Sequence, residues 1–393
     1  MQSGYAKRDV YLLAVCQALL ATGNAVVVTT SALVGQNLAP DGLATLPLFL
    51  QFVAVMMTAM PASYLMKRVG RRLGFALGAG FALTAGLLGA GAILVGSFSL
   101  FSVASFAYGV FMGFGMYYRF AAAEVAAPAF RPRAISYVLA GGVVAAIAGP
   151  ELAKATDDLF GPALFAGCFL AVAGLGLATL LVLAFLRILP PAEEERTGEE
   201  RPLGEIMRQP AFIVALSAAA IAQGAMVLVM TATPLAMAFC GHDFNQTAFV
   251  IQWHVLGMFA PSFVTGHLIS RFGVLNVMAV GAGLILACLG VALSGVEIAQ
   301  FWAALVLLGV GWNFMFVGGT SLLTTTYRPS EKAKIQAIND LIIFATAAFA
   351  SLSSGLLHHL IGWQAVNLSM ILPIIVMLGG ILWLQRRDLR AEA

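Results

Sequence analysis

Two short stretches of the chain resemble each other and indicate how it is organised. Residues 63–72 read SYLMKRVGRR, and residues 266–273 read GHLISRFG. Each closes a long apolar run with basic residues and a glycine, and another apolar run follows. A second pair, RPRAISYVLAGG (131–142) and RPSEKAKIQAIND (328–340), opens later apolar runs in the same order. The sequence therefore predicts two copies of one helical unit.

The composition indicates the kind of helix that these runs form. The 393 residues are 61% hydrophobic and 10% charged, with a mean hydropathy of +0.93, which indicates an all-α polytopic membrane protein. A helix needs about 20 apolar residues to cross about 30 Å of hydrocarbon. Twelve runs meet this need: 11–34, 43–66, 73–96, 98–119, 134–153, 162–187, 211–238, 245–268, 273–294, 298–326, 334–357 and 364–385. We expect the first run to stay as a span and not to act as a cleaved signal.

The basic residues predict how the chain is oriented. With the N-terminus in the cytoplasm, 20 of the 21 Lys and Arg fall on the cytoplasmic side, and only Lys154 falls outside. The positive-inside rule therefore predicts a multi-pass membrane protein with both termini in the cytoplasm. The polar stretch 188–210 is predicted to be a solvated cytoplasmic linker between an N-terminal half, 1–187, and a C-terminal half, 211–393.

Other signals exclude several classes of function. The chain has no phosphate-binding loop and no catalytic constellation, so we expect neither an ATP-driven pump nor an enzyme. Its four cysteines are scattered and lie mostly inside predicted spans, which does not indicate a disulfide framework. The basic residues form a cytoplasmic collar and need no nucleic acid. We expect a monomer whose partner is the lipid bilayer.

Two parallel repeats of six helices resemble the major facilitator superfamily. The turn at 63–72 is similar to that family's G-x-x-x-D-R-x-G-R-R loop: Arg68, Gly70, Arg71 and Arg72 match, whereas Ser63 and Lys67 replace the usual glycine and aspartate. The resemblance implies a twelve-helix secondary transporter that alternates access around a substrate site near the bilayer midplane.

Residues 224–258 carry methionine and histidine at regular spacing. Met226 and Met230 are one helical turn apart, and so are His254 and Met258. The two runs are antiparallel about a loop near residue 242, so Met230 should lie level with His254 and Met226 level with Met258. Thioethers and imidazole suit Cu(I), whereas Mg²⁺, Ca²⁺ and Mn²⁺ prefer oxygen. The pattern predicts a copper site; methionine as a gap-filler and a histidine bonded to Ser, Thr or backbone are the alternatives.

This Met/His pattern resembles the CcoA-like copper importers of the superfamily. That resemblance implies a protein of the bacterial inner membrane, through which copper, as transported substrate and not as cofactor, enters the cytoplasm for assembly of cbb3-type cytochrome c oxidase. Its metal ligands would be Met226, Met230, His254 and Met258. No copper chaperone can be identified from the sequence.

Further residues are secondary candidates. Met237 and Cys240 continue the soft donors outward as a metal relay. Asp340 is a candidate for proton coupling, with a helix cap or an ion pair to Lys334 or Arg328 as its alternative. The alternative substrate is an organic solute such as riboflavin or a drug, and a metal-binding receptor is a further alternative. First-half methionines that could join a site are Met56, Met60, Met112 and Met116. Aromatic residues that could stack on an organic solute are Tyr117, Tyr118, Trp253 and Trp312.

Overall fold

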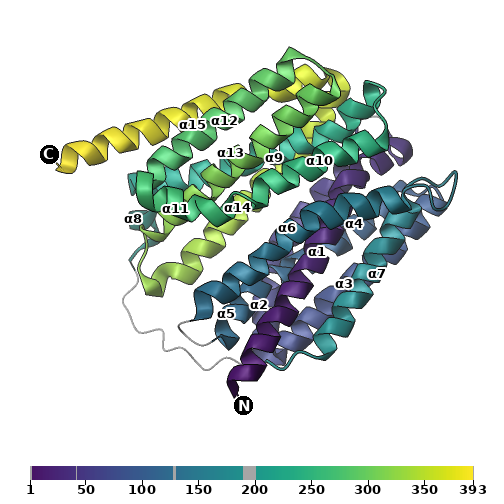
Figure 1. Ribbon diagram of the computed structural model, residues 1–393, viewed down its shortest axis with the longest axis horizontal. Helices are drawn as coiled ribbons and strands as arrows, with labels where there is room; N and C mark the ends of the chain where they lie inside the picture. Colours follow the sequence, from purple (N-terminus) through teal and green to yellow (C-terminus); the bar gives the residue numbers. More distant parts are fainter. Residues whose placement is uncertain (1, 41, 127–129, 189–200, 393) are drawn as a thin grey trace. The chain divides into compact units, whose positions relative to one another are not determined.

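The structure is a computed structural model that describes residues 2–40, 42–126, 130–188 and 201–392. Its regular elements are helices (Figure 1), so the prediction of an all-α protein is confirmed. The chain divides into two compact units, Met1–Glu194 and Glu195–Ala393.

The first unit is held together by close contacts between helices. α1 packs on α6 and α7, α3 packs on α4 and α7, and α2 packs on α4. A Cβ atom added at Gly86 of α3 would lie 2.3 Å from the backbone nitrogen of Ala173 in α7, so the two backbones touch. The helices are α1 (Gln2–Leu38), α2 (Leu46–Val69), α3 (Arg71–Leu94), α4 (Phe98–Gly115), α5 (Tyr118–Val125), α6 (Arg131–Thr156) and α7 (Ala166–Ala184).

The second unit is built around two central helices, α9 and α13. α13 packs on α9, α10 and α12, and α9 also packs on α14 and α15. The elements are α8 (Leu203–Met207), α9 (Pro210–Phe239), α10 (Phe244–Phe259), α11 (Ser262–Phe272), α12 (Val274–Ser294), α13 (Ile298–Thr324), η2 (Pro329–Glu331), α14 (Lys332–Leu360) and α15 (Trp363–Glu392).

The predicted run 245–268 is wrong as a single straight helix. The chain leaves α10 after Phe259 and enters α11 at Ser262, with a bend of 42° between them. Pro261 explains the break, because proline has no N–H to donate and its ring clashes with the carbonyl four residues earlier. Within the described residues, eleven helices are long and apolar enough to span a membrane, or twelve if the bent pair forms one span. The eleven correspond to the other eleven predicted runs.

The two echoed stretches form the same turn. Gly70 has φ +87° and donates its N–H to the carbonyl of Met66 at 3.0 Å. Gly273 has φ +85° and donates to the carbonyl of Ile269 at 2.9 Å. A positive φ is the region in which glycine avoids the strain of a Cβ atom, so each copy needs glycine at this point. Lys67 replaces the family's aspartate here, and the acidic partner of Arg71 is instead Glu124 of α5.

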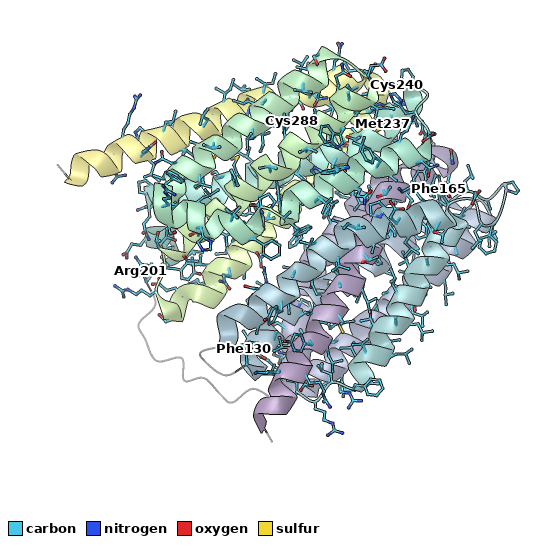
Figure 2. All side chains as sticks on the ribbon, in the orientation of Figure 1. Phe130, Phe165, Arg201, Met237, Cys240 and Cys288 are labelled. Atoms are coloured by element: carbon cyan, nitrogen blue, oxygen red, sulfur yellow. The ribbon has the colours of Figure 1, made fainter. Side chains whose placement is uncertain are left out.

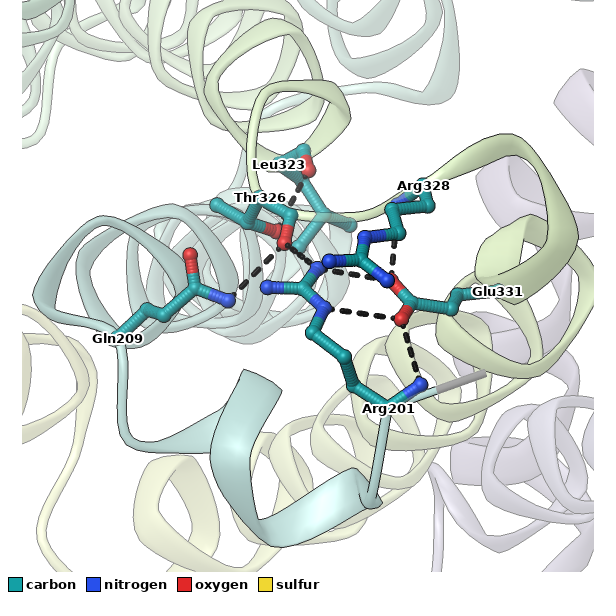
Figure 3. Close-up of polar contacts among 6 residues, drawn as sticks. All are labelled: Arg201, Gln209, Leu323, Thr326, Arg328 and Glu331. Atoms are coloured by element: carbon teal, nitrogen blue, oxygen red, sulfur yellow. Dashed lines mark hydrogen bonds and ion pairs between the residues drawn. The ribbon is translucent and has the colours of Figure 1, made fainter. Parts of the chain in front are cut away.

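The predicted linker 188–210 stays a prediction: residues 189–200 lie outside the described part of the chain, and residues 201–210 are partly exposed and partly bonded to the second unit. Figure 3 shows the hydrogen bonds from Arg201 to the carboxylate of Glu331. The backbone N–H and Nε of Arg201 both donate to Oε1 at 2.9 Å, and Nη2 donates to Oε2 at 2.8 Å. Arg201 also donates to the carbonyl of Thr326, as does Gln209. Glu331 is fully buried, and so is Ile206 of α8, whereas half of residues 201–210 are exposed, so this segment is anchored to the second unit at separate points. The Arg201 hydrogen bonds hold the pKa of Glu331 well below its usual range.

Candidate functional site

α13 fixes where the predicted histidine lies. A Cβ atom added at Gly309 of α13 would lie 2.4 Å from the carbonyl oxygen of His254 and 3.0 Å from the backbone nitrogen of Met258, so α10 and α13 touch backbone to backbone. His254 is fully buried, and its Nδ1 lies 2.8 Å from the carbonyl of Leu305. Since a carbonyl can only accept, Nδ1 carries the hydrogen and donates it. The other nitrogen, Nε2, is buried and meets no hydrogen-bond partner among the described residues.

The methionines of α9 can be placed against the same helix. Gln223 of α9 is hydrogen-bonded to Trp312 of α13, and the two helices run in opposite directions. Seven residues forward from Gln223 is Met230, and seven residues back from Trp312 is Leu305, so Met230 lies level with the carbonyl that holds His254. By the same register, Met226 and Met258 both lie level with Gly309.

The structure does not bring the four predicted ligands together by direct helix contact. α10 packs mainly on α13, α9 packs equally on α13 and α14, and α9 and α10 contact each other much less. Met226, Met230 and Met258 are each less than 10% exposed. No group of three or more His, Cys, Asp or Glu gathers to hold a metal ion in the described ranges. A copper site would therefore depend on the thioethers, and the prediction for these four residues stays a prediction.

The predicted relay residues lie at one end of α9 (Figure 2). Met237 is fully buried, whereas Cys240, just past the helix end, is an exposed free thiol. Partial burial and then the negative charge of Glu297 raise the pKa of Cys240. The neighbouring His242 already uses Nε2 on the carbonyl of Val296, at 2.8 Å. At the other end of the unit, Asp340 accepts a hydrogen bond from Nδ2 of Asn339 at 3.2 Å.

An aromatic cluster with an amide surrounds Trp312. The indole Nε1 of Trp312 donates to Oε1 of Gln223 at 2.9 Å. The ring stacks on Phe316, with centroids 4.7 Å apart and planes at 18°, and meets Phe259 of α10 edge-on at 6.4 Å. Trp312 and Gln223 are each 8% exposed. Three helices thus place a flat apolar surface beside a polar group.

The other predicted aromatic residues have different surroundings. Tyr118 is fully buried against Phe75, with centroids 4.7 Å apart. Tyr117 donates its hydroxyl to the carbonyl of Ala59 at 2.6 Å. Trp253 is exposed and lies edge-on to Trp302. Of the four predicted aromatic residues, Trp312 is therefore the one that combines a stacked ring with a side-chain amide.

Asn313 holds the break between α10 and α11 in place. It is buried, and its Nδ2 donates to the carbonyl of Met258 at 2.7 Å and to Oγ of Ser262 at 2.6 Å. Its Oδ1 lies 2.6 Å from the hydroxyl of Thr265. The bend at Pro261 interrupts the helical ladder, and Asn313 supplies a donor to a carbonyl beside the interruption. Asn313 therefore fixes the backbone that carries His254 and Met258.

The first unit contains a polar cluster that our sequence analysis missed. Nε2 of Gln51 in α2 donates to Oδ1 of Asn24 in α1, at 3.0 Å, and lies 3.0 Å from the sulfur of Met112 in α4. Met112 and the neighbouring candidates Met56 and Met116 are half-buried, and Met60 is exposed. The signal available in the sequence was a glutamine inside an apolar run, because polar side chains at membrane depth are costly and tend to be functional.

Comparison with known proteins agrees with this architecture. The family model of the Major Facilitator Superfamily matches residues 13–239 and 219–393. The chain is 41% identical over 393 residues to the riboflavin transporter RfnT of Brucella anthropi, covering 99% of this chain and 98% of that one. It is 30% identical to the uncharacterized MFS-type transporter YdeG of Bacillus subtilis, covering 95% and 93%. A crystal structure of a bacterial homolog to the human lysosomal transporter Spinster has the same fold, with a TM-score of 0.72 at 13% identity and 98% of both chains covered.

The fold and these matches define a multi-pass membrane transporter, not an enzyme. The chain belongs to the Major Facilitator Superfamily. The superfamily resemblance seen in the sequence is confirmed. The comparisons do not support its narrower form, the copper importers, because the relative with 41% identity is named for riboflavin.

Proposed function

We propose that this transporter carries riboflavin, or a closely related flavin, across the bacterial inner membrane by alternating access. The observation that carries the proposal is the 41% identity to the riboflavin transporter RfnT, which extends over 99% of the chain. An organic solute such as riboflavin, the alternative substrate in the sequence analysis, is thereby favoured over copper.

The cluster around Trp312 supports a flavin as the substrate. A flavin is a planar tricyclic ring with amide-like polar atoms on one edge, so it needs an aromatic face for stacking and a few fixed polar groups. The stacked rings of Trp312 and Phe316 supply aromatic surface of this kind, and the bond from Trp312 to Gln223 fixes the ring orientation. Copper needs neither feature. Met226, Met230 and Met258 then act as polarizable side chains that suit contact with an aromatic ring.

Uptake of labelled riboflavin tests the proposal. The chain would be produced in a riboflavin-auxotrophic bacterium that lacks its own riboflavin importer, and uptake of [³H]riboflavin and of ⁶⁴Cu would be measured side by side. Trp312→Leu removes the stacking face, and we expect its riboflavin KM to rise roughly tenfold, since an aromatic pair contributes about 0.5–1.5 kcal/mol beyond the area that it buries. Trp253→Leu, at an exposed tryptophan of α10, is the matched control and should change KM much less.

Two results would count against the proposal. A wild-type protein that is present in the membrane but takes up no riboflavin contradicts it directly. Uptake of ⁶⁴Cu that is lost in His254→Ala and in Met258→Ala, without riboflavin uptake, would restore the copper hypothesis. Riboflavin uptake that survives His254→Ala but weakens in Trp312→Leu supports the flavin reading over the copper one.

A further inference from the structure

Gln51 is a buried carboxamide whose hydrogen-bonding capacity is only partly used. Gln51 is fully buried in α2, and its Nε2 donates a hydrogen bond to Oδ1 of Asn24 in α1. Its Oε1 is also buried and accepts no hydrogen bond from any residue that the structure describes. Leaving a buried acceptor unpaired costs about 1–3 kcal/mol, so a role in binding is a reason to keep it.

The backbone around this amide is firmly placed. A Cβ atom added at Gly109 of α4 would lie 2.2 Å from the carbonyl oxygen of Gln51 and 2.7 Å from Cβ of Ala54. α2 and α4 therefore touch beside Gln51, and Asn24 holds the amide from the side of α1. Nε2 also contacts the thioether of Met112, which is half-buried and flexible, so it can swing aside when a ligand arrives. A fixed backbone and one movable neighbour are the properties of a pre-organised binding group.

The chemistry of the amide defines the ligand group that it fits. A carboxamide presents an acceptor oxygen and an N–H donor side by side, which matches an imide, where an N–H lies beside a carbonyl. The isoalloxazine ring of a flavin carries such an imide, with N3–H between two carbonyls. Gln223 is less suited to this task, because its Oε1 already accepts from Trp312.

We propose that Gln51, oriented by Asn24, recognises the imide edge of the substrate. Oε1 accepts N3–H, and the N–H of Nε2 that now points at the Met112 sulfur donates to a ring carbonyl. This inference rests on the proposed flavin transport and adds the part of the ring that is recognised. It predicts that the transporter accepts flavins with changes elsewhere but rejects those with a blocked N3.

Competition with N3-methylriboflavin tests the inference without any mutation. The methyl group removes the N3 donor and leaves the rest of the flavin unchanged. With the wild-type protein, we expect N3-methylriboflavin to compete with [³H]riboflavin at least about tenfold less well than unlabelled riboflavin, the ratio that corresponds to about 1.4 kcal/mol. Equal competition by the two compounds would overturn the inference, whereas absence of any riboflavin uptake would instead overturn the proposed function.

A pair of variants assigns the discrimination to Gln51. Gln51→Met keeps the side-chain volume without the amide, so riboflavin should bind more weakly and the ratio between the two competitors should fall to near one. Gln223→Met is the matched control: it also removes an amide from a central helix, and it should keep the wild-type ratio. A Gln51→Met protein that still discriminates as the wild type does would overturn the assignment. The ratio does not depend on membrane level, and the wild-type result stands even if Gln51→Met fails to fold.

Discussion

Replacing Asn313 by leucine should destabilise the second unit through the break between α10 and α11. Leucine has the same branched shape, although it is somewhat larger, and it offers neither donor nor acceptor. The carbonyl of Met258 loses the donor at 2.7 Å, and leaving a buried carbonyl unpaired costs about 1–3 kcal/mol. Ser262 is an exposed residue, so losing its bond to Asn313 costs less, and the hydroxyl of Thr265 keeps its bond to the carbonyl of Pro261 at 2.8 Å.

The expected loss for Asn313→Leu is therefore about 2–3 kcal/mol, most of it from one carbonyl. With about 2–4 °C for each kcal/mol in a unit of this size, the melting temperature should fall by roughly 5–10 °C. Asn276→Leu is the matched control: Asn276 is exposed, although it also donates to a carbonyl, that of Phe272, at 2.8 Å. Its effect should stay within about 0.5 kcal/mol.

Thermal unfolding of the purified protein in detergent micelles measures this effect. Asn313→Asp adds a second test, because aspartate keeps the acceptor for Thr265 but cannot donate to Met258 when ionised, so it should also melt below the wild type. If Asn313→Leu melts no lower than Asn276→Leu, the reasoning is refuted, and the break must be held by Pro261 alone.

Three further predictions concern other parts of the chain. Gly309→Ala should lower the free energy of unfolding by about 1–3 kcal/mol and impair transport, because the added Cβ atom would clash with backbone atoms of α10. Gly283→Ala is the control: its added Cβ atom has no neighbour within 4 Å, so it should be neutral in the same melting and uptake assays. Glu331→Gln should lower the melting temperature at neutral pH. Because the folded pKa of Glu331 is depressed, the gap from wild type should begin to narrow as pH falls below about 4.3 and should vanish only at the much lower folded pKa; a gap of the same size at pH 7 and at pH 3 would contradict this. Cys240 should react slowly with maleimide at pH 7 and faster as pH rises, and Glu297→Gln should shift that profile to lower pH; an unchanged profile would show that Glu297 does not act on the thiol.

Some of the candidate site followed from local sequence and some did not. Helical rise alone predicts that Met230 lies at the depth of His254 and Met226 at the depth of Met258. The registers of α9 and α10 against α13 place the same pairs at equal depth. The break at Pro261 was missed, although proline signalled it. The pairing of His254 with a backbone carbonyl was open as an alternative, but its partner, Leu305, could not be named.

The sequence by itself determined the spans, the repeat and the turn glycines. A membrane span must satisfy its backbone hydrogen bonds within its own helix, so about 20 consecutive apolar residues suffice to predict one. Gly70 and Gly273 are equally local, since a backbone at positive φ favours glycine whatever surrounds it.

Only the tertiary structure decided which polar side chains meet. Gln223 and Trp312 are 89 residues apart, and Arg201 and Glu331 are 130 apart. Their meeting depends on how each helix is rotated about its own axis. In a soluble protein, the contrast between a polar and an apolar face shows that rotation, but a span lies between lipid and other apolar helices, so both of its faces read alike. Close backbone contacts set this rotation, for example that of Gly309 in α13 with α10 and that of Gly109 in α4 with α2. They thereby decide the surroundings of Trp312 and Gln51.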